Sequence, residues 1–198
     1  QAHEHLLDFQ LMGVDLNVAL ALSSRIELEL RLPYRWAFID AQFLDESGQE
    51  LSDFESIHHR TETVSGFGDL AFVARYRLIG SISSSVWRWD ILAGMTFPTG
   101  GIEPDPFRLG KSGKSHQHLF FGTGTFNPQF GIELERYFST VSVAATSLWN
   151  GAIYKNSEDY QGPQTFTFSL DVRTSFGSPS WQFKLGTEFM KQWPAQWS

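Results

Sequence analysis

The sequence contains no cysteine and no run of about 18 consecutive apolar residues, the length that a membrane-spanning helix needs. The lack of cysteine excludes a disulfide framework, a thiol nucleophile and a cysteine-based metal site. The lack of a long apolar run excludes a transmembrane helix. Positive charge is also in deficit, and the formal net charge of -7 argues against nucleic acid as a partner.

A secretion signal is missing as well. The first residues, QAHEH, have neither the basic start nor the apolar stretch of a signal peptide. We therefore expect that an exported protein would carry this sequence in a processed or truncated form.

Aromatic residues, by contrast, are abundant, because they make up 15% of the chain and phenylalanine alone occurs 18 times. The clearest pattern is the stretch from Ile26 to Phe38, IELELRLPYRWAF, in which every even position is apolar and most odd positions are charged. Successive side chains of a strand point to opposite faces, so this stretch predicts a strand with one apolar and one charged face. It has at least the roughly 9–11 residues that a tilted strand needs to cross a bilayer. Its aromatic end is typical of the girdle where lipid meets water.

The same two-residue period recurs in seven further stretches: 6–22, 68–78, 86–98, 126–135, 141–149, 165–176 and 181–193. In the first of them the apolar set changes parity, which predicts a bulge near Leu11. A helix is the alternative for 6–22, and Gly13 and Asn17 weaken it. Short turns alternate with long polar inserts at about 40–66, 99–122 and 150–164. We predict an all-β, antiparallel up-and-down transmembrane barrel, with 1–198 as a single domain.

A soluble, lipocalin-like barrel is the rival interpretation. Its interior would be the apolar side and its exterior the charged side. Here every strand has one apolar face and one polar face. This favours lipid against the outer, apolar face and water or paired charges against the inner, polar face. Short turns at one end and long loops at the other are also typical of outer-membrane barrels.

The connectivity predicts more strands than the eight that are visible. The first strand ends in the short turn at Ser23–Arg25, so it begins on the long-loop, extracellular side. Bacterial barrels have an even strand number, with both termini usually at the periplasm. We therefore expect at least one strand before residue 1 and one after Ser198, in a barrel of about ten to twelve strands.

Four stretches resemble the outer-membrane proteins of the MetA pathway of phenol degradation, a family of transporters: LRLPY (Leu30–Tyr34), GFGDLAFVARYRL (Gly66–Leu78), MTFPTG (Met95–Gly100) and FGTGTFNPQFGIE (Phe121–Glu133). The resemblance covers most of the chain. It implies a barrel of 10–14 strands in a Gram-negative outer membrane. It also implies a role in the passage of small, hydrophobic or aromatic compounds, and it brings no catalytic residues.

The charged residues of the inward parity are candidates for lining a solute path: Glu27, Glu29, Arg31, Arg35, Asp69, Arg75, Arg77, Arg88, Asp90, Glu133, Glu135, Asp171, Arg173, Lys184 and Glu188. Both signs occur in similar number, which favours pairing across neighbouring strands. One interpretation is a constriction that selects a polar or charged solute. The other is that the charges satisfy one another and narrow or plug the interior.

Histidines fall only in the N-terminal lead and the long inserts: His3, His5, His58, His59, His116 and His118. The predicted topology places them all at the extracellular mouth. Imidazole binds zinc, copper and nickel, and a His-x-His pair puts two rings on one face of an extended segment. A loop metal site is therefore one hypothesis, and histidine as an ordinary polar loop residue is the other.

An enzyme is not expected, and neither is a cofactor. An outer-membrane lipid hydrolase needs a Ser–His pair at the rim, for which Ser112 or Ser115 beside His116 is the available set. Sequence adjacency does not supply the required hydrogen bond. We predict an outer-membrane channel for small molecules, with membrane lipid and the solute as partners. A non-conducting structural or metal-binding barrel acting through its extracellular loops is the alternative, and a lipid hydrolase is the third.

Overall fold

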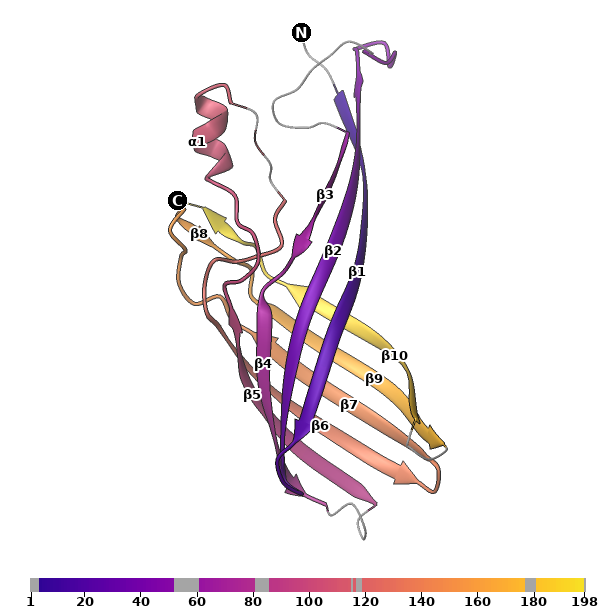
Figure 1. Ribbon diagram of the computed structural model, residues 1–198. Helices are drawn as coiled ribbons and strands as arrows, with labels where there is room; N and C mark the ends of the chain where they lie inside the picture. Colours follow the sequence, from indigo (N-terminus) through magenta and orange to yellow (C-terminus); the bar gives the residue numbers. More distant parts are fainter. Residues whose placement is uncertain are drawn as a thin grey trace.

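The computed structural model describes residues 4–51, 61–80, 86–114, 116, 119–176 and 181–197. It is an all-β fold with one short helix (Figure 1). The strands are β1 (Glu4–Ala21), β2 (Ile26–Leu44), β3 (Glu62–Phe67), β4 (Leu70–Ile79), β5 (Trp87–Phe97), β6 (Asn127–Phe138), β7 (Val141–Asn150), β8 (Tyr160–Gln161), β9 (Thr165–Phe176), β10 (Trp181–Gln192) and β11 (Gln196–Trp197), and the helix α1 is Pro106–Lys111. The predicted all-β class is confirmed.

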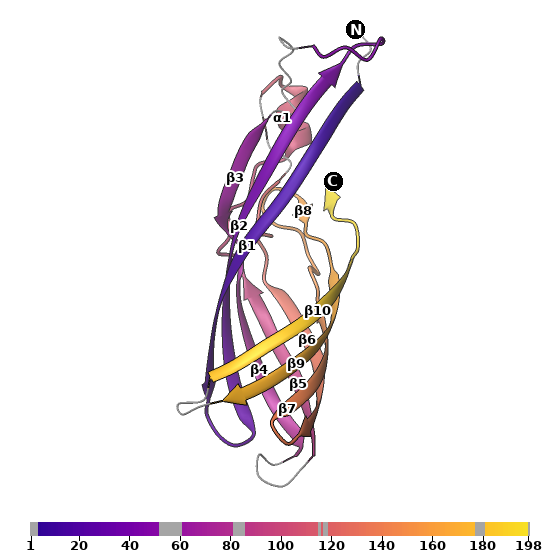
Figure 2. The same cartoon turned by 90° about the vertical axis from the view of Figure 1, so that its right-hand side faces the viewer.

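The eight long strands form one antiparallel sheet, in the order β1-β2-β4-β5-β6-β7-β9-β10. Each strand therefore lies beside the strand that precedes or follows it, as in an up-and-down barrel. β3 pairs with the upper part of β2, beyond the end of β4. The sheet curls into a half-barrel (Figure 2). Within the described ranges, β1 and β10 each pair with a strand on one side only.

The connections differ between the two ends of the sheet (Figure 1). At one end, residues 22–25 join β1 to β2, and residues 139–140 join β6 to β7. At the other end lie the described parts of the long connections between β2 and β3, between β5 and β6, which includes α1, and between β7 and β9, which includes β8. The predicted division into short turns and long loops is confirmed.

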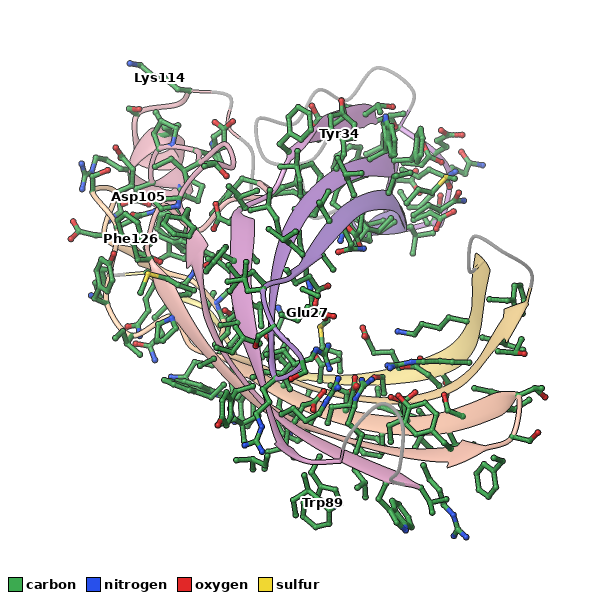
Figure 3. All side chains as sticks on the ribbon, turned by 60° about the horizontal axis from the view of Figure 1, so that its bottom comes forward. Glu27, Tyr34, Trp89, Asp105, Lys114 and Phe126 are labelled. Atoms are coloured by element: carbon green, nitrogen blue, oxygen red, sulfur yellow. The ribbon has the colours of Figure 1, made fainter. Side chains whose placement is uncertain are left out.

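Side-chain burial alternates along the strands, with polar residues buried and large apolar residues exposed, which is the reverse of the usual pattern in a soluble protein. On β5, Asp90 and Leu92 are 1% and 3% exposed, whereas Trp89 and Ile91 are 44% and 41% exposed. Figure 3 shows Glu27 pointing into the concavity and Trp89 pointing away from it. Charged residues are rarely buried unless they are paired. The concave face is therefore polar and the convex face apolar.

The prediction of a bulge near Leu11 is wrong. β1 pairs with β2 without interruption from Glu4–Leu44 to Ala21–Glu27. The apolar side chains change face instead: Leu7, Phe9 and Leu11 lie on the same face as Asp15, while Met12 lies on the opposite one. The helical alternative for 6–22 is wrong for the same reason.

The polar inserts are also more structured than predicted. β2 continues to Leu44 and β3 begins at Glu62, so the first insert is shorter than 40–66. The second contains α1, whose first turn is capped by the Asp105 carboxylate accepting from the amides of Phe107 and Arg108. No helix in the described part of the chain is long and apolar enough to cross a membrane.

Candidate solute path

The concave face holds an open cavity of about 500 Å³ between β1 and β2 on one side and β6 to β10 on the other. The predicted residues that line it are Glu29, Arg31, Arg35, Asp69, Arg75, Glu133, Arg173, Lys184 and Glu188. A smaller recess of about 80 Å³ lies beside the turn at Ser23 and Ser24, lined by Glu27, Arg77 and Asp90. Arg75 lines both spaces and so stands between them.

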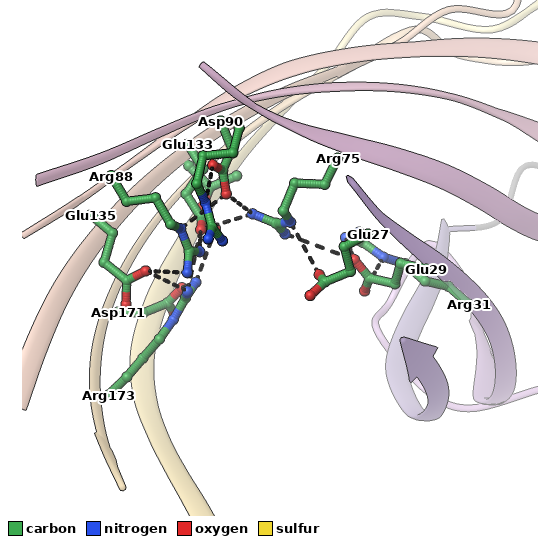
Figure 4. Close-up of polar contacts among 12 residues, drawn as sticks. Glu27, Glu29, Arg31, Arg75, Arg88, Asp90, Glu133, Glu135, Asp171 and Arg173 are labelled. Atoms are coloured by element: carbon green, nitrogen blue, oxygen red, sulfur yellow. Dashed lines mark hydrogen bonds and ion pairs between the residues drawn. The ribbon is translucent and has the colours of Figure 1, made fainter. Parts of the chain in front are cut away.

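Twelve of the predicted side chains join in one network of ion pairs (Figure 4). We call it the charged waist: Glu27, Glu29, Arg31, Arg75, Arg77, Arg88, Asp90, Glu133, Glu135, Asp171, Arg173 and Lys184. Six are cations and six are carboxylates, so the waist carries no formal net charge.

Glu133 is the centre of the charged waist and is 1% exposed. Its Oε1 lies 2.8 Å from Nη1 of Arg75 and also pairs with Arg88, and its Oε2 lies 3.0 Å from Nη2 of Arg173. The Thr146 hydroxyl donates to Oε2 over 3.0 Å. Three arginines from β4, β5 and β9 therefore converge on one carboxylate of β6.

Arg75 connects this cluster to the neighbouring strand β2, where Glu27 lies directly opposite it. Its guanidinium nitrogens lie 3.4 Å from Glu27, 3.9 Å from Glu29 and 3.7 Å from Asp90. Arg31 extends the chain, because it donates to both carboxylate oxygens of Glu29 over 2.7 and 2.9 Å. The charged waist thus reaches from β2 to the far wall.

Glu135 on β6 and Asp171 on β9 complete the charged waist. Glu135 lies 2.9 Å from Arg88 and accepts hydrogen bonds from the hydroxyls of Tyr137 and Ser142. Asp171 lies 3.3 Å from Arg173 and 3.1 Å from Lys184. Sequence reasoning missed these hydroxyl partners, whose only signal was a polar residue at an inward position.

Glycine makes room for two charged side chains. A Cβ on Gly186 would overlap the carboxylate of Asp171, which lies directly opposite on β9. A Cβ on Gly13 would lie 2.7 Å from the side chain of Arg35, its partner on β2, which pairs with Asp15. The missing side chains allow each charged group to lie flat on the concave face.

Three predicted residues are outside the charged waist. Arg35 pairs with Asp15 near the upper cavity wall. Glu188 on β10 lines the cavity and makes no ion pair within the described residues. Asp69 makes hydrogen bonds to loop residues at the end of the sheet where the long loops lie.

Asp69 holds both ends of the segment between β5 and β6 through its carboxylate. Oδ1 accepts from the amide of Gly100 over 3.0 Å, and Oδ2 accepts from the amide and hydroxyl of Thr123 over 2.8 and 2.6 Å. Beside it, the Gly68 amide donates to the carbonyl of Pro33 over 3.0 Å. All four stretches that carry the family resemblance therefore meet at this junction, which we call the Asp69 clamp.

Aromatic side chains gather at both ends of the convex face. Near the loop end, Tyr34 packs edge-on against Trp36 and Phe67 at centroid distances of 4.6 and 4.9 Å. At the turn end, the Arg136 guanidinium lies 5.0 Å from the Trp87 ring and 4.9 Å from the Phe138 ring. The apolar band between them is bordered by aromatic residues on both sides.

The histidine hypothesis stays a prediction. His3, His58, His59 and His118 lie outside the described residues, and only the backbone of His5 is described. His116 is buried, with Nδ1 2.9 Å from the carbonyl oxygen of Lys114. Three or more potential metal ligands do not gather anywhere in the part of the chain that the structure covers.

The other loop groups are engaged in local structure. Asp45 accepts from the Ser47 hydroxyl over 2.7 Å and from the amides of Ser47 and Gln49, and the Ser47 bond is the main cause that lowers the Asp45 pKa. The Ser112 hydroxyl donates to the Leu109 carbonyl over 2.8 Å, while Ser115 lies outside the described residues. The hydrolase alternative therefore stays a prediction.

No protein-family model matches this chain, and no curated protein sequence is significantly similar to it.

Proposed function

We propose that the half-barrel belongs to a closed transmembrane barrel of ten to twelve strands in a Gram-negative outer membrane. One observation carries this proposal: below the upper part of β1, most large apolar side chains face outward, whereas Asp90, Glu133, Glu135 and Asp171 are buried on the concave face. Lipid outside and water inside would give both faces a suitable solvent.

Strand length supports the same conclusion. β5 has 11 residues, from Trp87 to Phe97. At about 3.3 Å per residue and a tilt of about 40°, it spans roughly 25 Å, the height of the apolar band of an outer-membrane barrel. Aromatic residues at both ends of the convex face match the interfaces on either side of this band.

The free edges support closure. β1 and β10 expose backbone groups that no described strand pairs. In hydrocarbon each unpaired backbone group costs several kcal/mol, so only closed barrels are stable there. Further strands between β1 and β10 would remove both edges.

The proposed function of this barrel is the passage of small molecules. The cavity of about 500 Å³ is lined in part by the charged waist, and Arg75 of the waist also borders the recess at the turn end. The resemblance to the MetA-pathway family supports hydrophobic or aromatic solutes. Because the charged waist is balanced, we expect weak selectivity between anions and cations.

Single-channel conductance of the full-length protein in a planar bilayer tests this function. We expect stable open steps that small aromatic solutes block. Silence from protein that is folded in the bilayer would contradict the proposal and favour a plugged barrel. The Glu133→Gln variant sharpens the result, because a surplus of positive charge should shift the reversal potential toward anions.

A further inference from the structure

Above the charged waist, parts of two rows of cross-strand neighbours on the concave face carry no charge. The first part crosses β4 to β9 through Val73, Gly94, Gln129, Asn150 and Thr165, and the second crosses β5 to β9 through Leu92, Gly131, Leu148 and Thr167. Each row continues into the charged waist, because Val73 pairs with Glu29 and Leu92 pairs with Arg75. We call these nine residues the neutral belt. Gln129, Leu92, Leu148 and Thr167 line the 500 Å³ cavity.

The neutral belt contains two hydrogen-bond acceptors without donors. Gln129 is 8% exposed, and its Oε1 makes no hydrogen bond within the described chain. Asn150 lies directly opposite on β7, and its buried Oδ1 also lacks a donor. A buried acceptor without a donor costs about 1–3 kcal/mol and indicates a missing water or ligand. Two neighbouring carbonyl oxygens therefore require an O–H or N–H group.

The surroundings of Gln129 offer an apolar surface. Its partner on β5 is Gly94, and the next inward residue on its own strand is Gly131, and neighbouring atoms pack closely over both glycines. Leu148 lies over Gly131, with Cδ1 3.0 Å from where a Cβ would be. Together with the buried Leu92, it gives the neutral belt an apolar wall beside the unpaired acceptor.

The charges near the neutral belt are already paired. Arg31 is bound to Glu29 through two hydrogen bonds, and Arg35 is bound to Asp15. Glu188, a cavity carboxylate without an ion pair within the described residues, lies in the cross-strand row of Glu133 and not in the neutral belt. An ionic solute in the neutral belt would therefore lose its hydration without a free counter-charge beside it, which is unfavourable. The site therefore favours a neutral ligand.

We propose that the neutral belt binds a small neutral solute with an apolar body and one hydrogen-bond donor, an alcohol-type O–H or an amide-type N–H. The donor would bond to Oε1 of Gln129 after the side-chain amide turns this buried oxygen toward the cavity, and the apolar body would lie against Leu148 and Leu92. This inference rests on the proposed function for the route by which the solute arrives. Binding itself is measurable without transport.

The test uses the full-length protein in lipid nanodiscs and a matched pair of probes. Benzyl alcohol carries the donor, and benzyl methyl ether has nearly the same apolar body without it. We expect the alcohol to bind, by saturation-transfer NMR and calorimetry, about fivefold more tightly than the ether after correction for empty nanodiscs, the effect of one neutral hydrogen bond. Benzoate should bind more weakly than the alcohol.

Gln129→Leu keeps the approximate size and removes the acceptor. It should weaken the alcohol about fivefold and leave the ether unchanged. Gln42→Leu is the matched control, because Gln42 is exposed on β2 beyond the cavity, and it should change neither affinity.

Equal binding of alcohol and ether to the wild-type protein would overturn the inference, and this comparison needs no variant. An unchanged affinity for the alcohol in folded Gln129→Leu would also overturn it, because water alone would then satisfy Gln129. Conductance separates the two proposals. If the protein conducts but binds alcohol and ether equally, the transport proposal holds and the binding site is contradicted. If the protein prefers the alcohol but does not conduct, the binding site holds and the transport proposal is contradicted.

Discussion

The charged waist and the neutral belt are adjacent on one face of one sheet, yet they differ in how their polar groups are satisfied. Each carboxylate of the charged waist has a cationic partner, and Glu133 has three. In the neutral belt, Gln129 and Asn150 each keep a buried oxygen without a donor among the described residues, whereas Oδ2 of Asp90 in the charged waist, which also lacks a hydrogen bond there, lies 3.0 Å from Nε of Arg88. The charges therefore hold strands together, whereas the unpaired acceptors are the groups that we propose bind a ligand.

The largest effect is expected for Glu133→Gln. Removing this charge leaves Arg75, Arg88 and Arg173 with one carboxylate fewer, and breaking a buried ion pair costs about 3 kcal/mol. Urea unfolding from lipid vesicles measures the free energy of unfolding. Glu188→Gln is the control and should change it by less than about 0.5 kcal/mol. Equal losses in both variants would contradict a central role for Glu133.

Gly186→Ala tests the charged waist by adding volume without changing any charge. The added methyl group would overlap the Asp171 carboxylate and displace it from Arg173 and Lys184. We expect a loss of about 2 kcal/mol, typical of overpacking. The same unfolding assay checks it against Gly101→Ala, where no atom lies within 4 Å of the new Cβ. A neutral Gly186→Ala would show that Asp171 moves freely.

Asp69→Asn tests whether a satisfied carboxylate outside the charged waist also has a structural role. The amide can accept at one atom only, so it loses one side of the Asp69 clamp, at a cost of about 1.5 kcal/mol. Faster proteolysis within the loop at 98–126 is the expected readout. Asp8→Asn on β1, where the side chain is exposed, is the control. Unchanged proteolysis would show that other contacts hold the loops.

The smallest effect is expected for Gln129→Leu in the absence of solute. The substitution removes an acceptor that has no donor among the described residues, so the free energy of unfolding should stay within about 0.5 kcal/mol of the wild type or rise. A loss of 2 kcal/mol or more would show that Gln129 is bonded within the protein. That result would erase the distinction between the neutral belt and the charged waist.

Much of the fold could be predicted from periodicity. The two-residue alternation from Ile26 to Phe38 predicts a strand, and β2 is one. Parity alone failed near Leu11, because a bulge and an exchange of polarity between faces produce the same sequence pattern. The register shows the exchange: Leu7, Phe9 and Leu11 share the face of Asp15. β3 was missed because ETVSGF contains only two large apolar residues.

The candidate site could be predicted only in part. An inward charge such as Glu133 or Arg75 follows from strand parity. Which charges meet depends on the register between strands, and the sequence does not supply the cross-strand pairing that brings Arg173 to Glu133. Gln129 is one of several uncharged inward residues in the sequence. Its missing donor becomes visible only when its neighbours, Gly94 and Asn150, are known.

The most direct test of the membrane barrel is spin-label accessibility along β5. The chain has no native cysteine, so single substitutions can be labelled without background. We predict that labels at Ile91→Cys, Ala93→Cys and Met95→Cys, in protein reconstituted in bilayers, collide with oxygen in the lipid and are shielded from a water-soluble nickel chelate. Labels at Leu92→Cys and Thr96→Cys should show the opposite preference. Ready access of the nickel chelate to the outward set would contradict the account, because water rather than lipid would then cover the apolar face.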